Sequence, residues 1–215
     1  MNSSPQAGGG DRPKAMEITA AMVKQLRERT GAPMMNCKAA LTEAKGDMAA
    51  AEVLLRKQGM ASAAKKSSRA TSEGSVGAYI HAGGKLGVLV EVDCESDFVA
   101  RTDEFQAMLH DLAMHIAAAD PRYLDRGLIP ADVLEREKDI YRAQLPANKP
   151  AAVLDKILEG KLEKFYEEAC LLDQRYVKDD KITVRELVAE KISKFGENIA
   201  IRRFVRFKVG DAPGA

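Results

Sequence analysis

The sequence has too few cysteines and histidines for a disulfide framework or a zinc site. Its three cysteines, Cys37, Cys94 and Cys170, are an odd number and have no CxxC spacing. Of its three histidines, His110 and His115 are five residues apart, so that on a helix they would point in different directions. We therefore expect reduced cysteines, no bound metal and a cytoplasmic location.

An excess of one charge is also missing. Lys and Arg number 33, Asp and Glu number 32, and the formal net charge is +1. Sequence-independent binding to a nucleic-acid backbone draws on excess basic charge, so we expect no direct nucleic-acid partner. No stretch approaches the roughly 18 apolar residues of a membrane helix, and no membrane partner is expected. Residues 1–15 lack the apolar centre of a secretory signal, and their glycine, proline and polar residues predict a disordered leader.

Recognisable catalytic motifs are missing as well. Gly84-Lys85 invites a phosphate-loop interpretation, but Tyr79 stands where that motif needs its first glycine. Leu86 likewise stands where the motif needs a hydroxyl residue for magnesium. The glycine pair at 83 and 84 instead favours a hairpin turn. We expect no catalytic residue and no cofactor, and predict that the protein is not an enzyme.

Residues 16–60 carry the start and stop signals of three short helices. Thr19 and Asp47 are typical N-caps of the first and third helices, which end at Gly31 and Gly59. Three helices in so few residues form a small bundle near the lower size limit for independent stability. The residues predicted to face its interior are Met34, Cys37, Leu41 and Ala44 on the second helix and Ala51, Leu54 and Leu55 on the third.

The next segment, residues 61–73, is small, polar and basic, which predicts a linker whose first residues can be helical. The periodicity then changes to alternation, with apolar residues at every second position on both sides of a turn at 81–85. This pattern predicts a β-hairpin. The alternating residues are Val76, Ala78 and Ile80 before the turn and Leu86, Val88, Val90 and Val92 after it.

Residues 74–210 are predicted to form an α+β core domain with a three-stranded antiparallel sheet and helices, followed by a tail at 211–215. The last strand is expected at 199–209, where Phe204 and Phe207 cannot both share a face with Ile199 and Ile201, so that a bulge or burial on both faces is expected. Helices are predicted near 103–119, 131–145, 149–172 and 183–195. Three strands leave a face or edge uncovered, which a second copy of the chain could cover, so we expect a homodimer.

The segment Glu91-Val-Asp-Cys-Glu-Ser-Asp-Phe-Val-Ala-Arg101 combines a strand end with a helix start. Ser96 can cap a short helix, and Asp97 suits the positive N-terminus of that helix. Phe98 then lies on a tight corner, where it either packs into its own core or is presented to a partner as a wedge. From spacing alone the core interpretation is favoured.

This segment resembles the signature of elongation factor Ts, usually E-V-N-C-E/Q-T-D-F-V-A-K/R, with Asp93 and Ser96 as mild departures. A second signature of that family is visible at Leu26-Arg-Glu-Arg-Thr-Gly-Ala-Pro-Met-Met-Asn-Cys-Lys-Ala-Ala-Leu41. Here Pro33, Asn36 and Ala39 depart from the usual residues. The similarity covers essentially the whole chain after residue 15, in the manner of the short members with one core unit.

The resemblance implies a ubiquitin-associated-type (UBA-like) helical domain at 16–60 and a guanine-nucleotide exchange factor for the GTPase elongation factor Tu. In the family, the pair that matches Asp97 and Phe98 intrudes near the magnesium site of the GTPase, and GDP leaves. Five further residues match positions that the family presents to its partner, namely Arg27, Met34, Met35, Lys38 and His115.

Each of these assignments has a structural alternative. Met34 could belong to the local core, Arg27 and Lys38 to a solvated face, and His115 could be a buried, hydrogen-bonded histidine. The alternative function is a peptide- or ubiquitin-like-recognition module without exchange activity, because such bundles bind partners through a methionine-rich first loop.

Overall fold

The computed structural model describes residues 18–145 and 150–211, and it divides the chain into two compact units, Met1–Gln58 and Gly59–Ala215. The predicted leader at 1–15 and most of the predicted tail lie outside the described residues. Each unit is described by itself. The domain limits drawn from the sequence stay a prediction.

The first unit is a bundle formed by α1 (Ala20–Thr30), α2 (Met34–Glu43) and the first part of α3 (Met48–Lys66). The Thr19 hydroxyl accepts a hydrogen bond from the Met22 N–H and caps α1, which ends at Gly31 with a φ of 67°. Because that angle is left-handed, glycine suits the position. Both predicted ends of the first helix are therefore confirmed. The core consists of Val23, Leu26, Cys37, Ala40, Leu41, Ala51 and Leu55.

Two expectations for this region were wrong. Met34 lies at the first position of α2 and is 51% exposed, so it is not part of the bundle core. The third helix does not end at Gly59 but continues to Lys66. A glycine inside a helix costs only about 1 kcal/mol relative to alanine. Beyond it the helix gains contacts in the second unit, where Ala63 packs against the core and the Lys66 ammonium donates to the Ile192 carbonyl.

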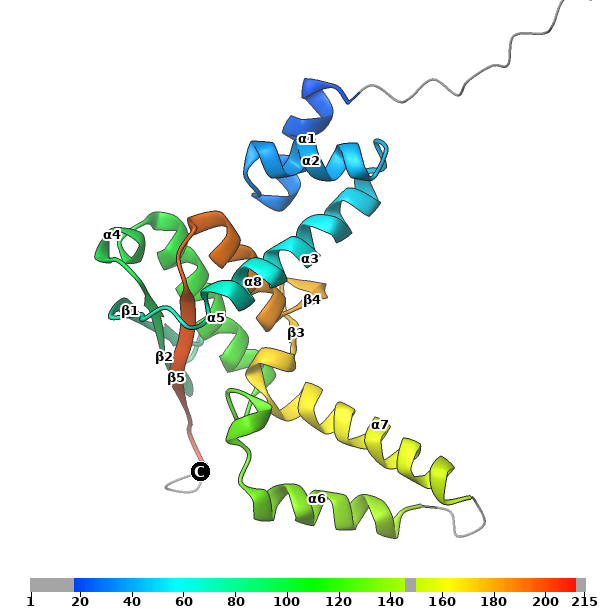
Figure 1. Cartoon of the computed structure of the whole chain (residues 1–215). Helices are drawn as coiled ribbons and strands as arrows, with labels where there is room; N and C mark the ends of the chain where they lie inside the picture. Colours follow the sequence, from blue (N-terminus) through cyan, green and yellow to red (C-terminus); the bar gives the residue numbers. More distant parts are fainter. Residues whose placement is uncertain (1–17, 146–149, 212–215) are drawn as a thin grey trace, which may run out of the picture. The chain divides into compact units, whose positions relative to one another are not determined.

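The second unit is built on a three-stranded antiparallel sheet with the order β1 (Glu73–Ile80), β2 (Leu86–Cys94), β5 (Ile199–Lys208). Figure 1 shows the central strand β2 between its two neighbours. The helix α5 (Asp103–Ala119) packs on the inner face of β1 and β2. The α+β class and the antiparallel sheet are confirmed. The main core comprises Val88, Val90, Val92, Phe105, Leu109, Leu112, Ile116, Leu171, Val184, Ile192, Ile199 and Ile201, among others.

The predicted bulge is present in β5. Glu91 pairs with Arg203, but the next residue, Val92, pairs with Ile201, so that Arg202 is the extra residue. Because one extra residue reverses the alternation, Phe204 returns to the inner face and packs against the core, whereas Phe207 points outward and is 68% exposed. The conflict between the two phenylalanines is resolved in this way.

The remaining elements connect the last two strands of the sheet. The described helices include α4 (Asp97–Ala100), α6 (Ala131–Ala143), α7 (Ala151–Ala169) and α8 (Val184–Phe195), with short 3₁₀ turns at Arg126–Leu128 and Leu171–Asp173. A two-stranded ribbon that was not predicted consists of β3 (Arg175–Tyr176) and β4 (Asp179–Thr183). Strands this short, with mostly polar residues, show no alternation that could reveal them. No helix in 18–145 or 150–211 is long and apolar enough to cross a lipid bilayer.

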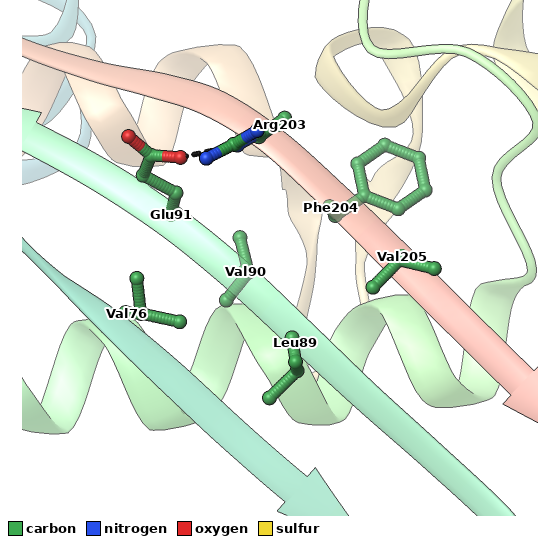
Figure 2. A pocket seen from close by; sticks show the side chains of 7 residues that line it. All are labelled: Val76, Leu89, Val90, Glu91, Arg203, Phe204 and Val205. Atoms are coloured by element: carbon green, nitrogen blue, oxygen red, sulfur yellow. Dashed lines mark hydrogen bonds and ion pairs between the residues drawn. The ribbon is translucent and has the colours of Figure 1, made fainter.

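The outer face of the sheet is apolar and exposed, and no other described element covers it. The register explains this, because the residues of β1 opposite the buried positions of β2 are Ser75, Gly77 and Tyr79. The larger apolar residues of β1 therefore point outward. Figure 2 shows part of this surface, which we call the outer sheet face; its exposed apolar residues are Val76, Ile80, Leu89, Val205 and Phe207.

Gly77→Ala should destabilise the second unit by about 1–3 kcal/mol, because overpacking a tight core forces neighbours to shift. A Cβ at Gly77 would lie 2.5 Å from Cγ of the buried Leu109. The matched control is Gly87→Ala, whose Cβ would lie 2.9 Å from Cδ1 of the exposed Ile80 and 3.9 Å from the Tyr79 carbonyl oxygen. Urea unfolding of the two variants checks the prediction, and equal stabilities would contradict the packing of α5 on β1.

Candidate protein-binding site

The segment Glu95–Arg101, here called the corner, directly follows β2 and contains the short helix α4. Ser96 has an extended backbone, and its hydroxyl accepts a hydrogen bond from the Val99 N–H at 3.4 Å, as predicted for an N-cap. Val99 and Ala100 are buried in the core of the unit. Val99 and Ala100 therefore anchor the corner in the core, and its other side is available to contact a partner.

Phe98 lies on that other side and is 78% exposed. The interpretation favoured by spacing alone, that Phe98 packs into its own core, is therefore wrong. Asp97 is exposed beside it and forms an ion pair with Arg101 over 2.8 Å, one helical turn away. Exposed pairs of this kind contribute about 0–1 kcal/mol, so the Asp97 carboxylate can exchange this partner at little cost.

The corner is also held by the residues directly before β5. The carboxylate of Glu197 accepts hydrogen bonds from the Ser96 N–H at 3.0 Å and from the Ser96 hydroxyl at 2.6 Å. The Glu95 carboxylate accepts one from the Asn198 N–H at 2.6 Å, and this bond holds the pKa of Glu95 below its usual value. Sequence reasoning missed these contacts because 101 residues separate Ser96 from Glu197, and no local pattern marks a pairing at that distance.

The other candidate residues of the first unit are all on its surface. Arg27 on α1 and Met34, Met35 and Lys38 on α2 are exposed, Met35 to 74%. The interior alternative for Met34 is thus excluded, whereas the solvated-face alternative for Arg27 and Lys38 stays open. These four residues belong to the first unit, whereas the corner belongs to the second.

His115 is fully buried on α5. Its Nδ1 accepts from the Val177 N–H at 3.3 Å, so its Nε2 is assigned as the N–H that donates to the Gln174 side-chain oxygen at 3.0 Å. Burial lowers the pKa of His115 below 6.5 and keeps the ring neutral. These contacts match the structural alternative and leave His115 no exposed atom for a partner.

Within the described part of the chain, no group of three or more His, Cys, Asp or Glu side chains is placed to hold a metal ion. The three cysteines are buried and unpaired. Burial raises the pKa of the Cys94 thiol next to the corner, which makes it a poor nucleophile. What the corner offers is an exposed aromatic ring beside a carboxylate, an arrangement suited to binding rather than to chemistry.

Comparison with known proteins gives a consistent family assignment. The family described as Elongation factor TS matches residues 62–211, which include the corner and the whole sheet. An Elongation factor Ts of Solibacter usitatus is 63% identical over 200 residues, which is 93% of this chain and 94% of the relative.

Two further relatives agree. The Elongation factor Ts of Koribacter versatilis is 60% identical over 197 residues, with 91% of this chain and 90% of the relative covered. That of Fervidobacterium nodosum is 54% identical over 197 residues, with 91% of this chain and 100% of the relative covered.

His115 should make the stability of the protein depend on pH. The unfolded chain takes up a proton below about pH 6.5, whereas the buried ring resists it, so the stabilisation is complete above that pH and is lost as the pH falls. The parent should therefore lose more unfolding free energy between about pH 7.5 and about pH 5.5 than His115→Gln does. Urea titrations at both pH values measure this difference.

The matched control is His110→Gln, because His110 is an exposed histidine on the same helix. This variant should keep the parental pH dependence. If His115→Gln and the parent lose the same unfolding free energy, His115 does not titrate as its buried contacts require.

Proposed function

Because this chain belongs to the elongation factor Ts family and is a translation elongation factor, we propose that it is a guanine-nucleotide exchange factor for elongation factor Tu. The observation that carries the proposal is the exposure of Phe98 on an anchored corner. A large aromatic side chain contributes little to its own domain when it is exposed, but it is a frequent anchor in protein interfaces. No catalytic residue is required for this activity.

In the proposed mechanism, Asp97 and Phe98 enter the nucleotide-binding domain of the GTPase near its magnesium site. Disturbing the magnesium ion removes charge compensation from the diphosphate, and GDP leaves. Binding free energies are reciprocal, so GDP must weaken the binding of this protein by the same factor by which the protein weakens GDP. The protein therefore acts as a shuttle that holds the nucleotide-free GTPase and is displaced by GTP.

We assign the first unit a docking role. The exposed side chains of Met34 and Met35 can adapt to a partner surface because methionine is flexible and polarisable. Arg27 and Lys38 add positive charge close by in sequence. Docking through this unit raises the effective concentration of the corner at the GTPase.

The second candidate function is a peptide- or ubiquitin-like-recognition module without exchange activity. The exposed methionine pair directly after Ala32-Pro33 favours it. The release of fluorescent GDP from elongation factor Tu separates the two candidates, because a recognition module would leave the rate unchanged. The corner, which lies in the second unit, has no place in that alternative.

The outer sheet face supports a homodimer, in which a second copy of the chain is the partner that covers it. Val76, Leu89 and Val205 come from three neighbouring strands and form a shallow apolar groove (Figure 2). The ion pair between Glu91 and Arg203 lies at its border, so both signs of charge are present on the same face. A face with apolar residues and both charges can match its own copy about a twofold axis.

The proposed dimer needs no disulfide, because the three cysteines are buried inside the units. We place the protein in the cytoplasm, where translation takes place, without direct contacts to nucleic acid or membrane.

Phe98→Ala should reduce the maximal rate of GDP release by roughly 30-fold, the effect of losing an interface anchor of about 2 kcal/mol. The unfolding free energy should stay within about 0.5 kcal/mol of the parent, because the ring is exposed. Leu128→Ala is the matched control, since Leu128 is 61% exposed in the same unit but outside the corner. A loss of about 3–5 kcal/mol in stability would be that of a buried phenylalanine and would refute the assignment.

The parent should sediment as a dimer under reducing conditions at tens of micromolar. Leu89→Arg introduces a charge into the outer sheet face and should give monomers, because two copies would bring like charges together in an apolar interface. Val153→Arg adds the same charge at an exposed valine of α7 and should remain dimeric. A monomeric parent would overturn the proposed dimer.

A further inference from the structure

The ladder between β2 and β5 continues past its last backbone pair by means of side chains. Cys94 pairs with Ile199 at the end of the ladder. If the register is extended by two residues, Glu95 faces Asn198 and Ser96 faces Glu197. In place of backbone carbonyls, the two carboxylates accept the backbone N–H groups of these facing residues, at 2.6 Å for Asn198 and 3.0 Å for Ser96. We call Glu95, Ser96, Glu197 and Asn198 the carboxylate clamp.

Glu197 contributes more to the clamp than a single hydrogen bond. Its second oxygen accepts from the Ser96 hydroxyl at 2.6 Å, and the oxygen of that hydroxyl accepts from the Val99 N–H inside α4. One carboxylate thus fixes both the backbone and the side chain of the residue that caps α4. Hydrogen bonds to an ionised acceptor are about twice as strong as neutral ones.

Glu95 and Asn198, the other two residues of the clamp, contact the segment before β1. The Arg69 guanidinium lies 3.4 Å from the Glu95 carboxylate, and the Asn198 side-chain amide donates to the Arg69 carbonyl at 2.9 Å. Asn198 is buried, so these contacts are not broken by a small movement at the surface. The clamp therefore holds together, at one end of the sheet, the chain segments that precede β1, α4 and β5.

The helix α4 needs such support because it has only four residues. Forming a single helical turn is unfavourable by itself, since several backbone angles are fixed for one hydrogen bond. Val99 and Ala100 anchor the C-terminal half of α4, but the exposed Asp97 and Phe98 make no core contact that could fix the N-terminal half. Besides the exposed ion pair of Asp97 with Arg101, which contributes little, the polar contacts of Ser96 set the direction of Phe98.

We propose that Glu197 is a positioning residue for nucleotide exchange, which holds Asp97 and Phe98 in their partner-binding orientation through Ser96. The inference rests on the function proposed above and deepens it by naming a residue that touches neither the partner nor the nucleotide. A side chain that is already held in its bound orientation loses less conformational freedom on binding. More of the interaction free energy is then available to disturb the nucleotide site of the partner. A misplacement of about 1 Å can cost 100-fold in rate.

Two substitutions of Glu197 distinguish an effect of its hydrogen bonds to Ser96 from an effect of its negative charge. Glu197→Ala removes both acceptors. Glu197→Gln can still accept from the Ser96 N–H with its oxygen and can donate to the Ser96 hydroxyl with its nitrogen, so the geometry is kept without the charge. Glu159→Ala, an exposed glutamate on α7, is the control for the change in net charge.

GDP release from elongation factor Tu is measured against the concentration of each full-length variant. Glu197→Ala should lower the maximal rate at least about tenfold, and its half-saturating concentration should change less than its maximal rate. Glu197→Gln should stay within about threefold of the parent, and Glu159→Ala should equal it. An undiminished maximal rate for Glu197→Ala, or a loss in Glu197→Gln as large as in Glu197→Ala, overturns the proposal.

Amide hydrogen exchange of the free protein provides a second readout that needs no partner. The Ser96 and Val99 amides should exchange at least about tenfold faster in Glu197→Ala and at parental rates in Glu197→Gln. Unchanged protection in Glu197→Ala overturns the proposal. If Glu197→Ala does not fold, Ser96→Ala takes its place, because it removes the hydroxyl link at an exposed corner, and it should lower the maximal rate likewise.

The two readouts distinguish failure of this inference from failure of the proposed function. If the parent itself does not accelerate GDP release, the exchange function is wrong, and the amide exchange rates alone decide whether Glu197 sets the position of the corner. If the parent is active and the amide rates do not respond to Glu197→Ala, the exchange function stands and the positioning role is wrong.

Discussion

The pairing of β2 with β5 is the interaction on which the rest of the second unit depends. It joins segments about one hundred residues apart and completes the sheet on which α5 packs. The same register sets the position of the bulge at Arg202, which returns Phe204 to the core and leaves Phe207 on the outer sheet face. It also brings Glu197 beside Ser96 at the end of the ladder. A register shift of one residue would turn every side chain of β5 to the opposite face of the sheet. All of these features therefore depend on the same register.

Much of this fold could be predicted because its signals are local. Caps such as Thr19 and Gly31 mark helix ends wherever they occur, and the alternation in β2 marks a strand with one buried face. The bulge could be predicted because Ile201 and Phe204 are both large and lie an odd number of residues apart. The sequence indicated that the first residues of 61–73 can be helical, but not that they continue α3 to Lys66, since the support comes from Ala63 and Lys66, which contact residues far along the chain. Contacts at that distance leave no trace in a short window of sequence.

For the candidate site, the sequence indicated which residues to consider but not whether each of them is exposed or buried in the fold. The helix start at Ser96 was a local pattern, whereas the exposure of Phe98 depends on what lies around the corner in three dimensions. Spacing alone favoured a buried ring for Phe98 and an interior position for Met34, and both side chains are exposed. His115 shows the reverse, because its partners Gln174 and Val177 lie about sixty residues away and place it in the core. Resemblance to a family gave the candidate residues, and only the fold distinguishes those on the surface from those in the core.

The way in which the corner is held fits the recognition role proposed for the exposed Phe98. If Phe98 were fixed by burial, it would have no surface left for a partner; if it were not fixed at all, ordering it would consume part of the binding free energy. Polar contacts to the neighbouring backbone solve both problems, because they restrain Ser96 and leave the ring uncovered. Single hydrogen bonds contribute only about 0.5–1.5 kcal/mol each, so one contact would not hold a four-residue helix. In the proposed positioning role, one carboxylate accepts two bonds from the capping residue and a second accepts the Asn198 N–H opposite it, and both leave Phe98 in solvent.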